Sequence, residues 1–512
     1  MSKYLLGIDV GTSSLKVAII DDDAQLIGIS SSKYDLIMPD EKSVQIEAKS
    51  MWRSLLECLI KLKEQKVDLS AVAGISISSL CPGLVALDAK GEVLVDPIIY
   101  SDRRSSKEAD EILQRVGKDK LFEITANGCM AGAFSGTSML WIKNHLPDSY
   151  KKTRYFGHLN TYLACRMTGE VGIDYSNASY TSLFETTGGK KWSDYLCETI
   201  GIDRDKLPPL HESTDVIGGL IDKELIGLGI KKNTPVIIGG ADTPCASIVA
   251  GVTHAGDVCE SVGTTDVLTV CIDKPVFGRE FINRCHVVPG TWIYQGAMSF
   301  TGAANAWFLE QFLNEVTASA KSLSEALKMA NEDADRSAPG CGGVVFLPYM
   351  LGERSPIWDA DARSVFFGIS IKTTRSDMNR AVLESCGYGL RQMCEIAQSL
   401  TGKEIKRFNS IGGGAKSNIW AQIKADITQR EITVLDKHDM APVGAGLLAG
   451  VGVGVFKDIY EASEKVQNKV YRKFVPNADK NLLEVYQRNY QIYLSLYPAL
   501  AGLFKKAAGK NS

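Results

Sequence analysis

One short pattern of residues occurs twice in this chain of 512 residues. Gly11-Thr12-Ser13 begins a run that closes at Asp21, and Gly263-Thr264-Thr265 begins a run that closes at Asp273. The first glycines and the closing aspartates both lie 252 positions apart. Each run passes from apolar residues through a turn of glycine and hydroxyl residues back to apolar residues, which predicts strand, turn and strand. The echo favours a duplicated fold with one copy in each half, and chance similarity is the alternative.

The first half continues as an alternation of strands and helices. We expect a hairpin from Tyr4–Asp9 and Leu15–Ile20, a helix over Met51–Lys63 and a buried strand over Val72–Ile77. This alternation is typical of an α/β domain. The length predicts two domains, which we place at residues 1–250 and 251–512. Residues 457–512 are rich in lysine and tyrosine and have a mostly helical pattern.

Composition narrows the class of partner. Apolar residues make up 45% and charged residues 23%, which is typical of a soluble globular protein. A formal net charge of −3 gives no electrostatic reason to expect nucleic acid or an anionic membrane as a partner. The chain has neither a signal-peptide pattern nor an apolar run of roughly 20 residues. Twelve cysteines without a CxxC pair indicate reduced thiols, so we expect a cytoplasmic protein that acts on small molecules.

The first glycine turn is a candidate phosphate site. Gly11, Thr12 and Ser13 can aim backbone N–H groups and hydroxyls at a phosphate, and Lys16 can meet its oxygens. Asp9 precedes the turn and is a candidate ligand for Mg²⁺, because this hard cation prefers oxygen ligands. The alternative is an ordinary tight turn with a solvated lysine. The run is neither a Walker loop nor a dinucleotide-binding fingerprint.

The run Asp9–Lys16 resembles the first phosphate motif of the FGGY carbohydrate kinases. Further stretches similar to motifs of this family follow in the family's order: 346–356, 364–384, 411–418 and 441–446. The resemblance implies an α/β fold of two actin-like (ribonuclease H-like) ATPase domains that face each other across a nucleotide cleft. It also implies a kinase that uses ATP with Mg²⁺, and it is greater to the xylulose-kinase branch than to the glycerol-kinase branch. The resemblance is compatible with a homodimer, and the sequence leaves the oligomeric state open.

Asp242 is the candidate catalytic residue. It follows a predicted strand, Pro235–Ile238, and two glycines, and it precedes Pro244 at the start of a helix. The residues alone are compatible with a helix cap, which Asp242 or Thr243 would serve. The resemblance implies that Asp242 is instead the general base, which orients a sugar hydroxyl and accepts its proton. Both roles can coexist.

The resemblance also assigns the rest of the ATP site. Gly263, Thr264 and Thr265 are similar to the second phosphate motif, which faces the first motif from the other domain. Gly302 matches a position beside the phosphates, and close helix packing is the alternative for it. The adenosine loop is implied to contain Gly413, Gly414, Ala415 and Asn418, with Asn418 expected one turn into a helix.

The acceptor site is less clear from the sequence. Ser79, Leu80 and Cys81 occupy the loop where the family binds its sugar, yet neither the Arg-Glu pair of glycerol kinases nor the Gln-Met-His-Gly of typical xylulose kinases is present. Asp102 is a candidate for binding sugar hydroxyls, or it pairs with Arg103 or Arg104. A ketopentose such as xylulose or ribulose is the leading acceptor. Asp242 is expected to be one of the residues that bind it. Another ketose or a polyol is an alternative, as is a catalytically silent regulator that binds sugar or nucleotide.

Overall fold

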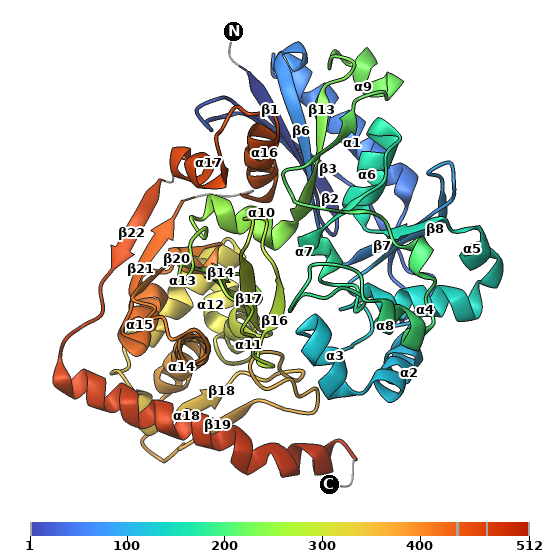
Figure 1. Ribbon diagram of the computed structural model, residues 1–512. Helices are drawn as coiled ribbons and strands as arrows, with labels where there is room; N and C mark the ends of the chain where they lie inside the picture. The colour runs from blue at the N-terminus through green and yellow to red at the C-terminus, as the bar shows by residue number, and fades with distance from the viewer. Residues whose placement is uncertain (1–2, 437–439, 467–468, 510–512) are drawn as a thin grey trace.

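The computed structural model describes residues 3–436, 440–466 and 469–509. In these residues, six strands of the first half form one mixed sheet at the top of Figure 1. Its order is β12 (Val216–Gly219), β13 (Pro235–Ala241), β6 (Val72–Ser79), β1 (Tyr4–Val10), β2 (Ser14–Ile20) and β3 (Leu26–Lys33). The hairpin strands run antiparallel, whereas β6 and β13 run parallel to β1. The expected hairpin and the strand beside it are confirmed, and β6 extends two residues further than expected.

The second half repeats this sheet. Its strand order in the described residues is β16 (Ile282–Cys285), β17 (Trp292–Met298), β15 (Asp266–Ile272), β14 (Val258–Val262), β20 (Arg407–Ile411), β21 (Glu431–Leu435) and β22 (Val470–Phe474). The β14–β15–β17 segment is an antiparallel meander like β1–β2–β3. Strands β20 and β21 then add in parallel, and β22 closes the edge antiparallel, as β12 does in the first sheet. The duplicated α/β fold predicted from the echo is therefore confirmed.

Helices cover both faces of the first sheet. The helix α1 (Ala48–Glu64), close to the expected helix, packs on β2 and β3, and α16 (Met440–Gly452) packs on β1 and β6. A Cβ atom added to Gly7 of β1 would lie 1.8 Å from the Pro442 carbonyl oxygen, so α16 docks directly on the strand backbone. A helix of the second half thus completes the core of the first sheet. The division at residue 250 stays a prediction.

A smaller sheet extends the first half. It is made of β4 (Leu36–Ile37), β5 (Gln45–Ile46), β8 (Val93–Ile99), β7 (Gly83–Leu87) and β9 (Tyr155–Gly157). The neighbouring helices are α2 (Ser106–Val116), α4 (Ser135–His145), α6 (Leu159–Thr168), α7 (Tyr175–Ala178) and α8 (Asp194–Ile200). In Figure 1 most of these elements lie on the right, beside and below the first sheet.

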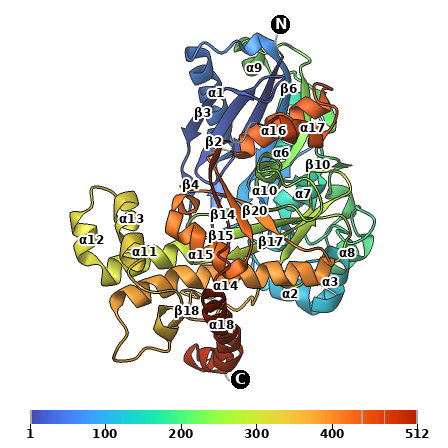
Figure 2. The ribbon, with the colours of Figure 1, turned by 90° about the vertical axis from the view of Figure 1, so that its left-hand side faces the viewer.

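Two helices, α14 (Arg375–Thr401) and α15 (Asn418–Thr428), pack on the second sheet. The long helix α18 (Lys480–Ala507) packs on these two helices and runs along the bottom of Figure 1. Three helices, α11 (Thr301–Phe312), α12 (Asn314–Ser319) and α13 (Leu323–Ala334), project to one side in Figure 2. The end of the chain is helical as expected in α17 (Ile459–Lys465) and α18, but the expectation missed β22 between them.

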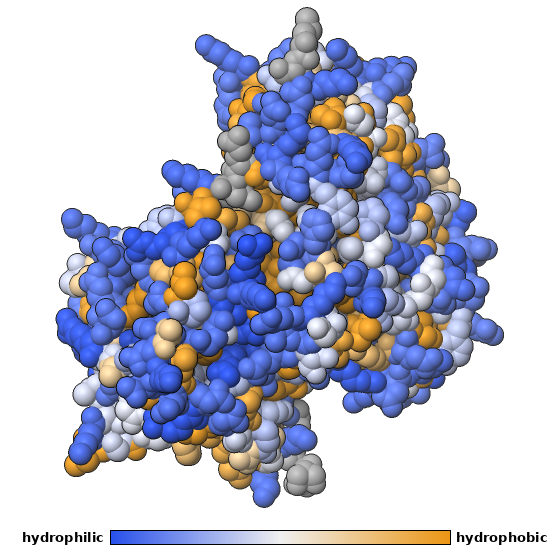
Figure 3. All heavy atoms as spheres, turned by 60° about the vertical axis from the view of Figure 1, so that its left-hand side comes forward, coloured by the Kyte–Doolittle hydropathy of each residue, from blue (hydrophilic) through white to orange (hydrophobic). Residues whose placement is uncertain are grey.

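The surface agrees with the composition. Hydrophilic side chains cover most of the face shown in Figure 3, with hydrophobic side chains scattered among them. Among the described residues, no helix combines the length and the apolar character that crossing a membrane requires.

Candidate active site

The first phosphate turn connects β1 to β2. The Gly11 N–H closes it by donating to the Ser14 carbonyl oxygen at 3.0 Å, and the Tyr34 hydroxyl donates to the Gly11 carbonyl oxygen. The Thr12 hydroxyl lies 3.2 Å from the Tyr100 hydroxyl, which joins the turn to the loop after β8. The turn is therefore held from two sides, and its contact with phosphate stays a prediction.

Asp9 and Asp242 lie at the same edge of the first sheet. Asp9 precedes the end of β1 and Asp242 follows β13, and both strands run parallel to β6, which lies between them. The side chain of Asp9 is buried, and its Oδ1 accepts a hydrogen bond of 2.8 Å from Ser78 Oγ of β6. No cluster of three or more His, Cys, Asp or Glu side chains that could hold a metal occurs among the described residues. A carboxylate in this position suits a magnesium ion that takes most of its ligands from phosphate and water.

The second phosphate turn connects β14 to β15. The Gly263 N–H donates to the Thr265 carbonyl oxygen at 2.8 Å, and the Ala303 N–H in the first turn of α11 donates to the Thr264 carbonyl oxygen at 3.1 Å. A Cβ atom on Gly302 would lie 2.0 Å from the Gly263 carbonyl oxygen. The close packing considered for Gly302 is thus present, and it places Gly302 directly against the second turn.

The loop predicted to bind adenosine borders a cavity of about 1090 Å³ in the second half. Gly413, Gly414 and Asn418 line it on one side, and residues of α13 line it on the other. This volume is sufficient for a small-molecule ligand. Ala415 is buried and is not part of the lining. Asn418 is the first residue of α15 instead of lying one turn inside it, because Ser417 caps this helix by accepting from the Trp420 N–H.

A buried ion cluster lies beneath the second turn, and the sequence analysis did not find it. Lys424 Nζ of α15 donates to Glu260 of β14 and, at 2.7 Å, to Asp266 Oδ2 of β15. Ser410 Oγ of β20 donates to the other Glu260 oxygen at 2.6 Å. The cluster fixes α15 to the two strands that carry the second turn. The spacing in the sequence gives no indication of it.

A bulge in β13 precedes Asp242. Gly239 has a φ of 72°, and a Cβ atom there would lie 1.9 Å from the Ile77 carbonyl oxygen, so only glycine fits. The helix α10 (Asp242–Val249) then begins at Asp242, whose Oδ1 accepts from the Thr243 N–H at 2.6 Å. The side chain is partly exposed. Burial raises the pKa of the Asp242 carboxyl, and the nearby Arg284 guanidinium opposes this shift.

A buried polar network extends from Ala241, the residue before Asp242, to Cys81. The backbone N–H of Ala241 donates to Ser176 Oγ at 2.9 Å, and Asn177 next to it lies 3.0 Å, Oδ1 to Nδ1, from His158. The same His158 nitrogen lies 3.8 Å from Cys81 Sγ. Burial lowers the pKa of His158 to about 4, so this imidazole is neutral at physiological pH. The network brings Cys81 and Asp242, which are 161 positions apart in the sequence, into one region of the fold.

The predicted acceptor residues differ in exposure. Cys81 is partly exposed, whereas the side chains of Ser79 and Leu80 are buried. Ser79 is the last residue of β6 instead of a loop residue, and the Leu80 N–H donates to the Val10 carbonyl oxygen at 2.8 Å. Only Ser79 therefore lies outside the expected loop, and contact of these three residues with a sugar stays a prediction. Burial raises the pKa of the Cys81 thiol to about 12.

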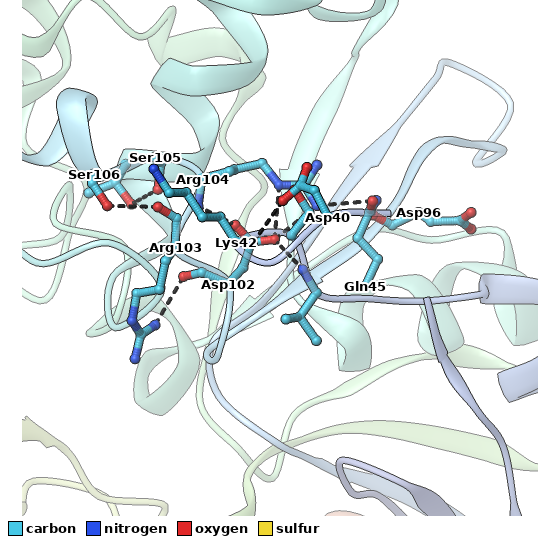
Figure 4. A network of polar contacts seen from close by, with 12 residues as sticks. Asp40, Lys42, Gln45, Asp96, Asp102, Arg103, Arg104, Ser105 and Ser106 are labelled. Atoms are coloured by element: carbon cyan, nitrogen blue, oxygen red, sulfur yellow. Dashed lines mark hydrogen bonds and ion pairs between the residues drawn. The ribbon is translucent and has the colours of Figure 1, made fainter. Parts of the chain in front are cut away.

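Asp102 forms the ion pair that was one of its two alternatives. Its Oδ2 lies 2.9 Å from Arg104 Nη2 and accepts from the Val44 N–H at 2.6 Å, and its Oδ1 accepts from the Arg104 N–H at 2.9 Å. Figure 4 shows this carboxylate within a network that includes Gln45. Both oxygens thus bind Arg104 in the loop that follows β8, and Oδ2 also binds Val44 next to β5. Contact of Asp102 with a sugar stays a prediction.

Arg284 lies near Cys81 and Asp242, and the sequence analysis did not find it. It lies on β16 and is buried, with its guanidinium 4.1 Å above the ring of Tyr180. A charged residue within the mostly apolar stretch 281–288 was the available indication. Arg284 comes from the second half of the chain and Tyr180 from the first, so the two halves meet here.

Family models and sequences of known proteins match most of this chain. The N-terminal domain of the FGGY family of carbohydrate kinases matches residues 4–249, and the C-terminal domain of that family matches residues 259–453. A xylulose kinase of Bacillus subtilis (strain 168) is 30% identical over 500 residues, covering 97% of each chain. A gluconokinase of the same organism is 25% identical over 474 residues, covering 92% of each chain.

Solved structures agree as well. The crystal structure of a xylulose kinase from Rhodospirillum rubrum superimposes with a TM-score of 0.90 at 25% identity, covering 98% of this chain and 100% of the other. The two-domain α/β fold predicted from the motifs is therefore confirmed, as is the resemblance on which that prediction rested.

Proposed function

Because the chain belongs to the FGGY family of carbohydrate kinases, we propose that it transfers the γ-phosphoryl group of ATP to a ketopentose. Xylulose and ribulose are the leading acceptors, and the similarity to xylulose kinases over nearly the full chain supports this class. The observation that carries the proposal is Asp242, a partly exposed carboxylate at the sheet edge that also bears the first phosphate turn.

Asp242 acts as the general base in this proposal. Its carboxylate accepts the proton of one sugar hydroxyl while the hydroxyl oxygen forms a bond to the γ-phosphorus. The bond between that phosphorus and the bridging oxygen breaks, and the products are a sugar phosphate and ADP. The hydrogen bond from the Thr243 N–H holds one carboxylate oxygen in place. Burial raises the pKa of Asp242, which makes the carboxylate a better proton acceptor than an exposed aspartate.

The nucleotide lies between the two turns in this proposal. Gly11, Thr12, Ser13 and Lys16 contact phosphate from the first half. From the second half, Gly263, Thr264 and Thr265 contact phosphate, with Gly302 beside them. The adenosine moiety occupies the cavity lined by Gly413, Gly414 and Asn418. Asp9 would hold Mg²⁺ directly or through water, and the ion would neutralise charge on the phosphates.

Location and assembly follow as expectations. All twelve cysteines lie in described parts of the chain and are free thiols, which fits the reducing cytoplasm where ATP is available. A homodimer stays a prediction of the family resemblance.

A coupled assay of ADP release tests the proposal. The panel contains Mg-ATP with ketopentoses, ketohexoses, polyols, gluconate and glycerol, and the variants are Asp242→Asn and the control Asp22→Asn. Asp22 is an exposed residue of the turn between β2 and β3. We expect ketopentose-dependent turnover that falls roughly 10²-fold or more in Asp242→Asn and is unchanged in the control. Equal ATP hydrolysis without sugar, or full activity of Asp242→Asn, would contradict the proposal.

A further inference from the structure

Arg284 is a buried cation whose hydrogen bonds are incomplete. Its side chain is 1% exposed, and Nη1 donates to Gln295 Oε1 at 3.3 Å. The buried Nε and Nη2 atoms have no hydrogen-bond partner among the described residues. Leaving a buried donor unpaired is unfavourable, and more so for a charged group. The arrangement is accounted for if a bound ligand supplies the missing hydrogen-bond acceptors of Arg284.

The two unpaired atoms belong to the same edge of the guanidinium. Nε–H and the adjacent N–H of Nη2 point in parallel, which is the geometry that binds two neighbouring oxygen atoms. The opposite edge is anchored to Gln295, which also accepts a hydrogen bond of 3.0 Å from the Tyr180 hydroxyl. Tyr180 supports the face of the guanidinium at 4.1 Å. The group is therefore fixed in orientation, and its Nε–Nη2 edge is the one left without a hydrogen-bond partner.

The surroundings of Arg284 place this edge in the acceptor region. Cys81 and Asp242 are both partly exposed: the Cys81 thiol lies within reach of the guanidinium as a weak hydrogen-bond partner, and Asp242 interacts with it electrostatically. Burial opposes the charge of Arg284, but Tyr180, Cys81 and Asp242 raise its pKa, so the residue stays a cation. The hydrogen bond from the Ala241 N–H to Ser176, and the contacts of His158 with Asn177 and Cys81, border the same region. Arg354 is a second cation near Tyr180, and its Nε donates to Ser299 Oγ at 3.1 Å.

We propose that Arg284 is an acceptor-binding residue whose Nε and Nη2 donate to two adjacent oxygen atoms of the sugar. This inference rests on the proposed function, because it assigns a second contact in the site of Asp242. Asp242 binds the hydroxyl that is phosphorylated, and Arg284 binds an oxygen pair elsewhere on the same molecule. In a ketose this pair is the carbonyl oxygen and a neighbouring hydroxyl, and in a sugar acid it is the carboxylate. Arg284 thereby selects for acceptors that carry such a pair.

Binding without ATP tests this inference separately from turnover. Isothermal titration calorimetry would measure the Kd of D-xylulose, D-ribulose, xylitol and gluconate for the wild type, Arg284→Lys, Arg284→Gln and Asp242→Asn. The control is Arg430→Lys, a buried arginine of the second half whose Nε is also unpaired. Thermal unfolding of each variant establishes that it is folded.

We expect both Arg284 variants to bind the preferred acceptor about 10- to 100-fold more weakly, the range for hydrogen bonds to a charged group. The Kd of ATP should be unchanged in these variants, and the Kd of the acceptor should be unchanged in the Arg430→Lys control. Loss confined to the ketoses identifies the carbonyl and hydroxyl pair, whereas loss for gluconate identifies a carboxylate. An acceptor Kd within twofold of the wild type in folded Arg284→Lys overturns the inference alone.

A crystal structure of the wild type with its bound acceptor gives a second measurement, which does not depend on the folding of a variant. Nε and Nη2 should each lie within about 3.2 Å of an acceptor oxygen, and an acceptor bound elsewhere overturns the inference. Failure of the wild type to bind any acceptor overturns this inference and the proposed function together. Full activity of Asp242→Asn with intact dependence on Arg284 overturns only the proposed role of Asp242.

Discussion

Ser78 Oγ donates a hydrogen bond of 2.8 Å to Asp9 Oδ1, and this contact joins the ends of two neighbouring parallel strands, β6 and β1. The bond orients a buried carboxylate next to the first phosphate turn. Groups that orient a metal ligand in this way typically contribute 10- to 100-fold to metal affinity or activity. In the proposal that Asp9 binds Mg²⁺, Ser78 is the residue that orients this ligand. The sequence analysis assigned no role to Ser78.

The first prediction concerns this pair. Ser78→Ala should raise the concentration of Mg²⁺ needed for half-maximal turnover about 10-fold, and Asp9→Asn should raise it further, because it removes the charge of the proposed ligand. Turnover is measured by coupled ADP release during titration with Mg²⁺ at fixed ATP. The control is Ser70→Ala, which alters a serine near the start of β6 and away from the turn. An unchanged Mg²⁺ dependence in Asp9→Asn would contradict the proposed metal site.

The second prediction concerns the contact between Gly302 and the second turn. Gly302→Ala would place a Cβ atom 2.0 Å from the Gly263 carbonyl oxygen, so either α11 or the turn must move. We expect the KM for ATP to rise about 10-fold or more, equivalent to the 1–3 kcal/mol typical of overpacking. The measurement is a titration with ATP at saturating acceptor.

Gly502→Ala serves as the matched control for this substitution. Gly502 lies in α18, where nothing would contact an added Cβ atom within 4 Å. Alanine there should stabilise the protein by about 0.5–1 kcal/mol without changing the KM for ATP. A normal KM for ATP in Gly302→Ala would show that the second turn tolerates displacement.

The third prediction concerns Lys424. Replacing it with methionine leaves the carboxylates of Glu260 and Asp266 buried without their cation. Removing one partner of a buried ion pair costs about 3–5 kcal/mol, so Lys424→Met should lower the free energy of unfolding by that amount in urea titrations. Lys403→Met is the control, because Lys403 forms an exposed ion pair with Asp273 at 2.7 Å. It should lose at most about 1 kcal/mol, and equal losses in both variants would contradict the argument.

Local sequence patterns predicted the parts of the site that are close together in the chain. The turn at Gly11 and the position of Asp242 after a strand follow from strand periodicity and from glycine followed by a helix start. Arg284 and Lys424 could not be found in this way, because their partners lie on other elements. Asp266 is 158 positions from Lys424 in the sequence, and only the strand order of the second sheet brings them together.

Exposure was the other property that the sequence did not predict. The acceptor loop reads as a run of small and apolar residues from Ser78 to Gly83, and nothing in it distinguishes the partly exposed Cys81 from the buried Leu80. Burial there depends on α6, since Leu159 lies against Gly83. The strand β22 was missed for a related reason, because its burial is confined to Phe474 at its end.

The last prediction concerns the pH dependence of stability. Burial lowers the pKa of both His158 and His286 from 6.5 to about 4, so each is neutral in the folded protein near pH 5 and protonated in the unfolded chain. The unfolded state then binds more protons, and the stability that these residues contribute above pH 6.5 is lost as the pH falls towards 4. Each histidine should lower the free energy of unfolding by about 2 kcal/mol between pH 7 and pH 5.

Urea titrations at pH 7 and pH 5 measure this loss for the wild type and His286→Gln. The His286 imidazole lies 2.9 Å, Nε2 to oxygen, from the Val252 carbonyl, and its Nδ1 accepts from the Val287 N–H. Glutamine at this position has no group that titrates between pH 7 and pH 5. His286→Gln is expected to be less stable at pH 7, yet to lose about 2 kcal/mol less than the wild type on acidification. His145→Gln is the control, because the His145 side chain on α4 is exposed. This variant should lose nearly as much stability between pH 7 and pH 5 as the wild type. The same loss in the wild type and in His286→Gln would contradict the assignment, since acidification would then act through other groups.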